Sequence, residues 1–395
     1  MKIQFEKNPE QIELIKALAS ENKTVAMQAQ EAFAAFISDV VLQVLLQAGT
    51  ASMIYRDIEF DEDDSPSIPL DLYYGQGEGT ISVWSQTVGG GLPSNLQQGL
   101  QEMKINTYRL DSAISMEKRY VRRARLDVVA AGLERMANEL LVKQERNAWA
   151  VILKAVAEAT TAQNSGGSVL NHTIVANSAT AGVAGSFDID TLNKLWTNVR
   201  RINAAYTGGT PLNLQARGLT DLFVSPEIKE QIRGFAYQPM NTKGANNQAG
   251  TAASGVLGLP NSVREEIFRG SGTQEIFGVT IHELLELGAG RKYNSLFATF
   301  ANAKNLTYTG TGASAPTISG QNFATNASVN QIVVGVDATR NAFLRPVAIQ
   351  SESRGQVKVL PDDQFLARSQ KVGFYSYVEE GRVCTDARGV VGIIV

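Results

Sequence analysis

The sequence predicts an α+β fold, and three observations lead to this class. A helical pattern of apolar residues covers residues 28–48, and a much longer one runs from Ala124 to Glu158. Between them, residues 53–110 form short alternating runs separated by turn-forming clusters, which is typical of β-strands. After residue 160, single strands and helices follow one another without an internal repeat. The chain therefore combines helices and strands, as an α+β fold does.

The first predicted helix covers residues 28–48 and is followed by a glycine. Over residues 28–48, apolar side chains from Phe33 to Ala48 recur at intervals of three to four, and Gly49 is a natural stop. The strand-like runs that follow are broken at 63–69, 75–79 and 88–95, so we expect a long extended β-hairpin. The next helix, about 35 residues long, makes a rod of roughly 50 Å, which suits a structural spine.

The second half of the chain alternates short elements. A helix begins near Phe187, with Asp188 or Asp190 as its N-cap, and runs to about Ile202. A buried strand at 219–224 leads into a helix that starts at Pro226. Strands return in three later places, which are 332–336, 348–350 and 390–395.

Composition excludes several classes of protein. The 395 residues are 44% hydrophobic and 19% charged, which allows a large core. One cysteine and two histidines exclude a disulfide framework and a zinc site of about four Cys/His ligands. A net charge of −3 is unlike the basic domain of a dedicated nucleic-acid binder. No signal peptide or apolar stretch of ~20 residues is present, so we expect a soluble protein from a reducing cytoplasm.

Charge is unevenly distributed along the chain. Residues 24–103 hold eleven acids and one basic residue, Arg56, for −10, which leaves +7 for the remainder of a chain whose total is −3. Residues 104–160 hold eleven basic and seven acidic groups, for +4. This asymmetry favours an acidic segment that lies on the basic surface of another copy. A solvated acidic loop is the alternative.

The sequence contains no recognisable motif for metal binding, phosphate binding or nucleophilic catalysis. The acidic run Asp57–Asp64 lacks the central glycine of a calcium loop, and the glycines of 75–79 precede a strand where a phosphate loop needs a helix. Neither His172 nor His282, expected in a strand, belongs to a nucleophile motif, and Cys384 fits a small strand residue. We therefore predict no catalytic, cofactor-binding or metal-binding residue, and no enzyme.

Three blocks of sequence resemble the major capsid protein of tailed bacteriophages, which has the Hong Kong 97-type fold. They are Ser65–Tyr74, Val83–Thr87 with its Gly-rich tip at 89–91, and Tyr108–Val129, and residues 133–149 continue the match. The resemblance implies four parts: an N-terminal arm (1–50), an extended β-hairpin loop (51–110), a peripheral domain with the spine helix (111–160 and 331–395), and an axial domain (161–330).

The function that this resemblance implies is that of a structural subunit of an icosahedral phage capsid. Such subunits self-assemble into pentamers and hexamers that enclose double-stranded DNA without sequence-specific contacts. The implied partners are a separate scaffolding protein, a portal protein and, in some capsids, decoration proteins, with no membrane and no cofactor. The expected location is the virion capsid, assembled in the host bacterial cytoplasm.

Two features depart from the type member of this fold. No lysine lies between Lys23 and Lys104, so we expect no covalent cross-link through a loop lysine. Only 27 residues precede the arm helix, which leaves no room for a fused scaffolding domain. We therefore expect little or no maturation cleavage.

Intersubunit contact residues are predicted from charge together with the capsid resemblance. The basic cluster 118–125 precedes the spine helix; it is either a solvated helix start or a surface for an acidic neighbour or a phosphate backbone, and we favour the neighbour. The predicted contact residues are Asp61, Glu62, Asp63, Asp64, Trp84, Arg119, Arg122 and Arg123.

Other functions stay open at this point. An encapsulin-like nanocompartment shell shares the fold but encloses a protein cargo. A soluble enzyme with a distributed active site belongs to a different class, and it is disfavoured because the sequence carries no acid, base, metal or phosphate signal. A β-rich adhesin or tail protein fits the long spine helix poorly.

Overall fold

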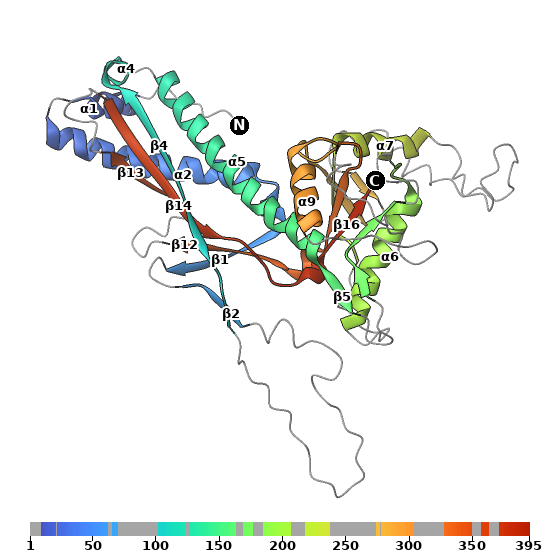
Figure 1. Cartoon of the computed structure of the whole chain (residues 1–395). Coiled ribbons are helices and arrows are strands. Elements are labelled where there is room, and N and C mark those ends of the chain that lie inside the picture. The colour runs from blue at the N-terminus through green and yellow to red at the C-terminus, as the bar shows by residue number, and fades with distance from the viewer. Residues whose placement is uncertain are drawn as a thin grey trace, which may run out of the picture. The chain divides into compact units, whose positions relative to one another are not determined.

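The structure is a computed structural model, and its mixture of helices and sheets confirms the α+β class (Figure 1). The residues that it describes are 9–20, 22–61, 65–69, 102–123, 126–162, 169–176, 185–206, 218–237, 274–276, 278–303, 328–349, 357–362 and 371–395. None of the helices among these residues is long and apolar enough to cross a membrane.

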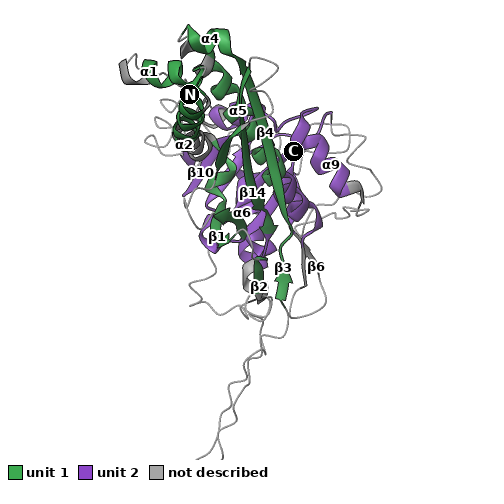
Figure 2. Ribbon diagram, turned by 90° about the vertical axis from the view of Figure 1, so that its left-hand side faces the viewer, with its two compact units in different colours: residues 1–69, 101–149, 343–383 green, residues 70–100, 150–342, 384–395 purple. Residues whose placement is uncertain are grey.

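The chain divides into two compact units, each made of segments far apart in the sequence (Figure 2). Unit 1 comprises Met1–Pro69, Gln101–Trp149 and Phe343–Val383, and unit 2 comprises Leu70–Leu100, Ala150–Ala342 and Cys384–Val395. The long helix α5, Leu126–Glu158, contributes residues to both units.

Unit 1 combines the helices α1, α2, α4 and most of α5 with a six-stranded sheet and a two-stranded ribbon. Its elements other than α5 are α1 (Pro9–Leu18), α2 (Lys23–Ala48), η1 (Ala51–Met53), β1 (Tyr55–Asp61), β2 (Ser67–Pro69), β3 (Glu102–Lys104), β4 (Thr107–Glu117), α4 (Lys118–Arg122), β12 (Phe343–Ile349), β13 (Lys358–Asp362) and β14 (Lys371–Gly381).

The strand β14 organises the unit 1 sheet. It pairs antiparallel with β4 along all eleven of its residues, and its other edge meets β13 and the end of β12. Next to β12 lies β1, and these two strands run parallel. Because β4 alternates exposed and inward side chains, it marks a sheet with one covered face and one open face.

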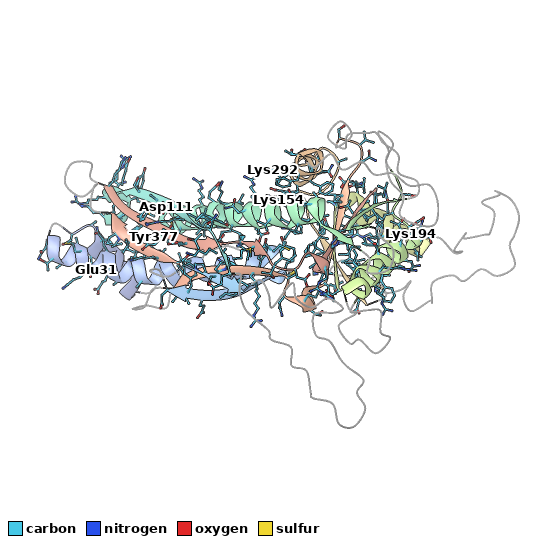
Figure 3. All side chains as sticks on the ribbon, turned by 60° about the horizontal axis from the view of Figure 1, so that its bottom comes forward. Glu31, Asp111, Lys154, Lys194, Lys292 and Tyr377 are labelled. Atoms are coloured by element: carbon cyan, nitrogen blue, oxygen red, sulfur yellow. The ribbon has the colours of Figure 1, made fainter. Side chains whose placement is uncertain are left out.

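Helices α2 and α5 supply the core on the covered face. Phe33 of α2 contacts Phe374 of β14, with ring centroids 5.4 Å apart. Leu133 and Met136 of α5 belong to the same buried cluster. At Gly132 a Cβ atom would lie 2.7 Å from Ile114 Cδ1, so this glycine allows α5 to lie close to β4. On the open face, Asp111 and Tyr377 occupy paired positions of β4 and β14 (Figure 3).

The hairpin expected over 51–110 is seen in part. Residues 67–69 of β2 pair antiparallel with 102–104 of β3, and residues 70–101 lie outside the described residues. The strands on either side of this ribbon, β1 and β4, do not pair with each other; they pair with β12 and β14 from the C-terminal part of the chain. Alternation alone predicted these strands but could not predict such distant partners.

Unit 2 contains a second six-stranded sheet with helices packed on it. Apart from the end of α5, its elements are β5 (Thr160–Ala162), β6 (Val169–Asn171), β7 (Thr173–Val175), α6 (Ile189–Tyr206), β8 (Asp221–Val224), α7 (Pro226–Tyr237), β9 (Gln274–Ile276), β10 (Val279–Glu283), α9 (Lys292–Ala303), β11 (Ile332–Val336), η2 (Ala338–Arg340), η4 (Ala387–Gly389) and β16 (Val390–Ile394). The two-residue strand β15 (Val383–Cys384) spans the unit boundary and pairs with β12.

The strand order of the unit 2 sheet is β7-β16-β11-β8-β10-β9. Every residue of β11 and β16 is buried, as expected for central strands covered on both faces. Two glycines allow close packing there: a Cβ at Gly335 would lie 2.5 Å from Leu219 Cδ1, and one at Gly392 would lie 2.6 Å from Val156 Cγ1.

Several local predictions for this half of the chain are confirmed. Helix α6 follows Asp188, which accepts a hydrogen bond from the Thr191 amide at 2.7 Å, and α7 begins at Pro226. The expected strands at 219–224, 332–336 and 390–395 are β8, β11 and β16. However, β11 and β16 pair with each other and with strands of unit 2, whereas the sequence grouped them with the peripheral strands. Their fully apolar runs place them at the centre of this sheet.

Candidate intersubunit surfaces

The predicted basic surface lies on α4, the short helix that follows β4. Arg119 and Arg122 belong to this helix and Arg123 is its C-cap residue; all three are exposed. The Arg119 side chain is 66% exposed, forms an ion pair with Glu117, and has its Cζ atom 5.0 Å from the centre of the Tyr120 ring. The three arginine side chains thus lie on the surface of unit 1.

A buried valine fixes the direction of this basic helix. Val121 is 2% exposed and joins the cluster that contains Ile15 and Leu18 of α1. Because α4 is only five residues long, one buried side chain is enough to turn its arginines outward. The sequence predicted the positive charge here, and the structure adds the anchoring on α1.

The acidic candidates are only partly described. Asp61 is exposed at the end of β1. Glu62, Asp63, Asp64 and Trp84 lie outside the described residues. In one subunit Arg119 pairs with Glu117, its neighbour two residues away, so the structure does not bring Asp61 and Arg119 together as an ion pair.

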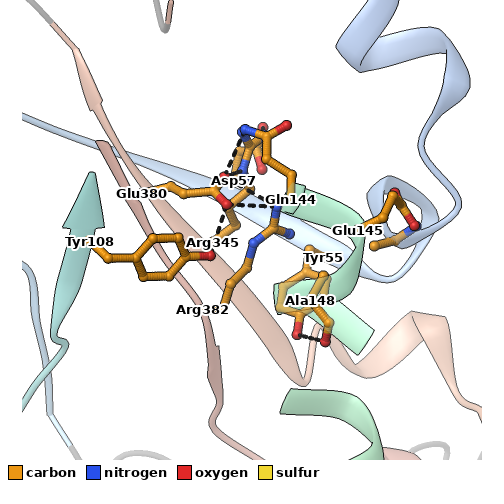
Figure 4. A network of polar contacts seen from close by, with 10 residues as sticks. Tyr55, Asp57, Tyr108, Gln144, Glu145, Ala148, Arg345, Glu380 and Arg382 are labelled. Atoms are coloured by element: carbon orange, nitrogen blue, oxygen red, sulfur yellow. Dashed lines mark hydrogen bonds and ion pairs between the residues drawn. The ribbon is translucent and has the colours of Figure 1, made fainter. Parts of the chain in front are cut away.

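A buried polar network that sequence reasoning missed lies within unit 1 (Figure 4). The Glu380 carboxylate is fully buried and accepts hydrogen bonds from Tyr108 Oη at 2.9 Å and Gln144 Nε2 at 3.2 Å. It also accepts from Arg345 Nε at 2.7 Å and Arg382 Nη2 at 3.2 Å. One carboxylate therefore joins β4, α5, β12 and the end of β14.

A second polar connection joins the end of α2 to α5. Glu145 accepts hydrogen bonds from Thr50 Oγ1 at 2.7 Å and from the Ala51 amide at 3.1 Å. Trp149 Nε1 donates to Thr50 Oγ1 at 3.2 Å, and Tyr55 Oη donates to the Ala148 carbonyl at 2.9 Å. These bonds hold the chain between α2 and β1 against the long helix.

The role of this network is to stabilise the fold of unit 1. Both carboxylate oxygens of Glu380 accept hydrogen bonds, and Arg345 is paired a second time, with Asp57 at 3.3 Å. Burial and the nearby Glu380 carboxylate raise the pKa of Tyr108 to about 12, so the phenol keeps its proton and its hydrogen bond. Within this network Arg382 Nε has no hydrogen-bond partner, but the central carboxylate is paired on both oxygens. A buried carboxylate paired in this way rigidifies a fold and helps to specify it.

One local signal of the network is present in the sequence. Residues 372, 374, 376 and 378 alternate as the inward positions of β14, and Glu380 is the next inward position. A carboxylate in a buried series requires several donors. The donors could not be identified, because they come from positions up to 272 residues away.

A partly exposed ladder of side chains on the open face of unit 1 was also missed. The Arg109 guanidinium lies 3.7 Å from the centre of the Tyr377 ring, donates to Asp111 at 2.8 Å, and donates to Tyr375 Oη at 2.9 Å. Tyr375 Oη in turn donates to Asp111 at 2.6 Å, which raises the pKa of Tyr375. The ladder gives this face an ordered polar and aromatic surface.

His172 is the most buried titratable group of unit 2, with 1% of its surface exposed. Its amide donates to the Ala159 carbonyl, and its own carbonyl accepts from the Gly392 amide at 2.9 Å. The ring Nδ1 lies 3.0 Å from the Val390 carbonyl oxygen. Burial lowers the pKa of this imidazole, so the folded protein holds it neutral.

The burial of His172 predicts that the folded protein loses stability in mild acid. Because the pKa of His172 is lowered on folding, its stabilising contribution is complete above the unfolded pKa of ~6.5 and is lost as the pH falls toward the folded value. We expect His172→Gln to reduce the fall in melting temperature between pH 7.5 and pH 5.5, measured by calorimetry. His282→Gln is the control. Equal acid sensitivity in wild type and His172→Gln would contradict this prediction.

The remaining candidate groups do not form a reactive centre. His282 lies in strand β10 as expected and bonds Asp221 at 2.8 Å, stacked on Phe223 with centroids 5.0 Å apart. Cys384 lies in β15 as expected, and burial raises the pKa of its thiol to about 12, which disfavours the nucleophilic thiolate. Among the described residues, no three His, Cys, Asp or Glu side chains are placed to hold a metal ion.

Comparison with known proteins gives matches in structure only. No protein-family profile and no curated protein sequence matches the chain. The capsid structure of the cyanophage P-SCSP1u is 12% identical and covers 86% of each chain, with a TM-score of 0.43. The capsid of the cyanophage Pam1 is 12% identical over 86% of this chain and 88% of that one, with a TM-score of 0.42.

A third similar structure is the virus-like particle from Pyrococcus furiosus. It is 10% identical and covers 91% of this chain and 99% of that one, with a TM-score of 0.41.

Proposed function

We propose that this chain is a structural subunit of an icosahedral phage capsid and has no enzymatic activity. The observation that carries the proposal is the motif block Tyr108–Val129, which runs from the open-faced strand β4 through the basic helix α4 into the 33-residue helix α5. The sequence of this block resembles that of capsid subunits, and its fold gives the expected strand, basic turn and spine. A long helix bonded to a sheet by a buried network suits a rigid building block.

Assembly is the mechanism that follows from this function. Copies of the chain form pentamers and hexamers, and the acidic residues that end β1 and follow it, Asp61–Asp64, contact Arg119, Arg122 and Arg123 of a neighbour. One exposed ion pair contributes little, so stability comes from repetition and buried area over the whole shell. Trp84 is a further candidate for the same interface.

The finer parts of the proposal concern partners and location. The shell encloses double-stranded DNA without sequence-specific contacts, is assembled on a separate scaffolding protein in the host bacterial cytoplasm, and carries a portal protein. Decoration proteins are optional additions. The low net charge supports DNA contact without sequence readout, since a dedicated reader of DNA would be strongly basic.

An encapsulin-like nanocompartment shell is the second candidate, and the test separates it from a capsid by its contents. Particles are purified from cells that express the chain with its neighbouring reading frames and are treated with nuclease. A capsid protects double-stranded DNA of uniform length. Particles that instead hold a protein cargo and no DNA would contradict the capsid proposal and support the nanocompartment.

A further inference from the structure

Among the described strands, β7 is an edge of the unit 2 sheet, and it is held at a junction with β16 and α5. Its three residues, Thr173–Val175, pair in parallel with Gly392–Ile394 of β16. Thr173 Oγ1 donates to the Val156 carbonyl of α5 at 2.9 Å. A short edge strand held by few bonds is the kind of element that opens locally while the rest of a fold stays intact.

His172 directly precedes β7 and lies inside this junction, with 1% of its surface exposed. Its amide donates to the carbonyl of Ala159, just after α5, at 3.3 Å, and its carbonyl accepts from the Gly392 amide of β16 at 2.9 Å. The ring Nδ1 lies 3.0 Å from the Val390 carbonyl oxygen. Because a carbonyl only accepts, we assign the proton of the neutral ring to Nδ1, so Nε2 is the atom that takes up a second proton in acid.

The charged groups near the ring are already paired with one another. Asp386 is the carboxylate that acts on the ring; its Oδ1 accepts from Arg388 Nε at 2.7 Å and its Oδ2 accepts from Arg340 Nη1 at 3.1 Å. Arg340 is also ion-paired with Asp337, with 3.6 Å between Nε and Oδ2. Two aspartates and two arginines cancel in charge, so a proton on His172 adds one buried positive charge to a neutral cluster.

The remaining elements of the junction supply little charge. Strands β5, β6, β7 and β16 contain no charged residue, and the last charged residue of α5 is Glu158, which is partly exposed. Asp386 can turn toward a protonated ring only by giving up its bonds to arginine. The junction is therefore poorly suited to hold a protonated imidazole in its closed form.

His282, the second of the two histidines of the chain, has a different environment. Its Nε2 lies 2.8 Å from Asp221 Oδ1, so a proton taken up there meets an adjacent carboxylate. It belongs to β10, which pairs with β8, and β11 separates this pair from β16 and β7. Acid therefore acts differently on the two sides of the unit 2 sheet.

We propose that His172 is a pH switch: uptake of one proton by its ring opens β7 from β16 and from the end of α5, while β8 and β10 stay paired. Burial lowers the pKa of the ring more than the carbonyls of Val390 and Ala387 and the Asp386 carboxylate raise it. The ring thus binds its second proton more readily in the open form, where its pKa is ~6.5, and opening is favoured as the pH falls below this value. The switch belongs to a single subunit and goes beyond the proposed shell function.

Hydrogen–deuterium exchange of the full chain, followed by mass spectrometry, tests the opening strand by strand. Exchange is measured at pH 7.5 and pH 5.5, and each peptide is normalised to the same peptide of the unfolded chain at that pH. We expect the opening equilibrium of the peptide that covers 169–176 to rise by as much as about tenfold at pH 5.5, the limit for one proton at a group of unfolded pKa ~6.5. Peptides that cover 221–224 and 279–283 should keep their protection. An equal gain in both regions, or no gain at 169–176, would overturn the proposal.

Two variants assign the response to one ring. His172→Asn keeps an N–H donor close to the position of Nδ1 but takes up no proton, so residues 169–176 should exchange equally at the two pH values. His282→Gln is the matched control and should keep the wild-type response. A pH response as large in His172→Asn as in the wild type would reject the switch.

These measurements remain decisive if a variant or the shell function fails. Where His172→Asn does not fold, the contrast between residues 169–176 and 279–283 of the wild type decides by itself. No assembled shell is needed, so a chain that forms no particles contradicts the proposed function and leaves the test of His172 unchanged.

Discussion

Replacing Glu380 by glutamine is expected to destabilise unit 1 by about 3 kcal/mol, the cost of breaking a buried ion pair while its partners stay in place. The carboxylate is fully buried and accepts from Tyr108, Gln144, Arg345 and Arg382. Glutamine keeps the size of the side chain but removes its charge and turns one acceptor into a donor. Arg382 is then left without its carboxylate in a buried position.

Glu379→Gln is the matched control for this change. Glu379 is the adjacent residue, lies on the other face of β14, and accepts a hydrogen bond from Thr107 Oγ1 at 2.8 Å. Urea denaturation of both variants and the wild type gives the free energies of unfolding. A cost for Glu380→Gln no greater than that for Glu379→Gln would show that the network does not hold α5 to the sheet.

Reversing the charge of Arg119, Arg122 and Arg123 together is expected to abolish assembly while the subunit stays folded. All three side chains are exposed, and the contacts of Arg119 with Glu117 and Tyr120 are local ones at the surface, so the subunit should keep its fold. It places three negative charges where an acidic neighbour is proposed to lie, and the loss is multiplied over every contact in a shell. Sedimentation velocity measures assembly, and circular dichroism measures folding.

A triple variant with the same change in net charge serves as the control. Lys154, Arg201 and Lys292 are exposed residues of unit 2, and their replacement by glutamate should leave assembly intact. Lysines at positions 61–64 should restore assembly of the α4 variant if these surfaces meet. Normal particles from the Arg119, Arg122 and Arg123 variant would reject this interface.

Local patterns predicted the elements whose own residues determine them. The apolar spacing of 124–158 predicted α5 nearly to its ends, and Asp188 and Pro226 marked the starts of α6 and α7. In contrast, α1 and α9 were missed. They have ten and twelve residues, and brief helices depend on tertiary packing more than on intrinsic propensity. Helix α7 is as short as α9 but was predicted, because Ser225 and Pro226 mark its start.

The rest of the fold could not be predicted, because it depends on contacts between residues far apart in the sequence. The sequence contained the strand pattern of β1 and β4, but their partners β12 and β14 lie hundreds of residues away, and alternation does not say which strand pairs with which. The same limit hid the donors of Glu380 and the stacking of Arg109 on Tyr377. Charge was more informative, because the basic cluster of α4 is contiguous in sequence.

Negative-stain electron microscopy of the purified chain, expressed alone and with its neighbouring reading frames, tests the central claim most directly. The shell function predicts closed particles or tubes of uniform curvature, or free pentamers and hexamers where the scaffold is missing. A monodisperse monomer or dimer under all of these conditions would contradict it and would make a screen for enzymatic substrates the next experiment.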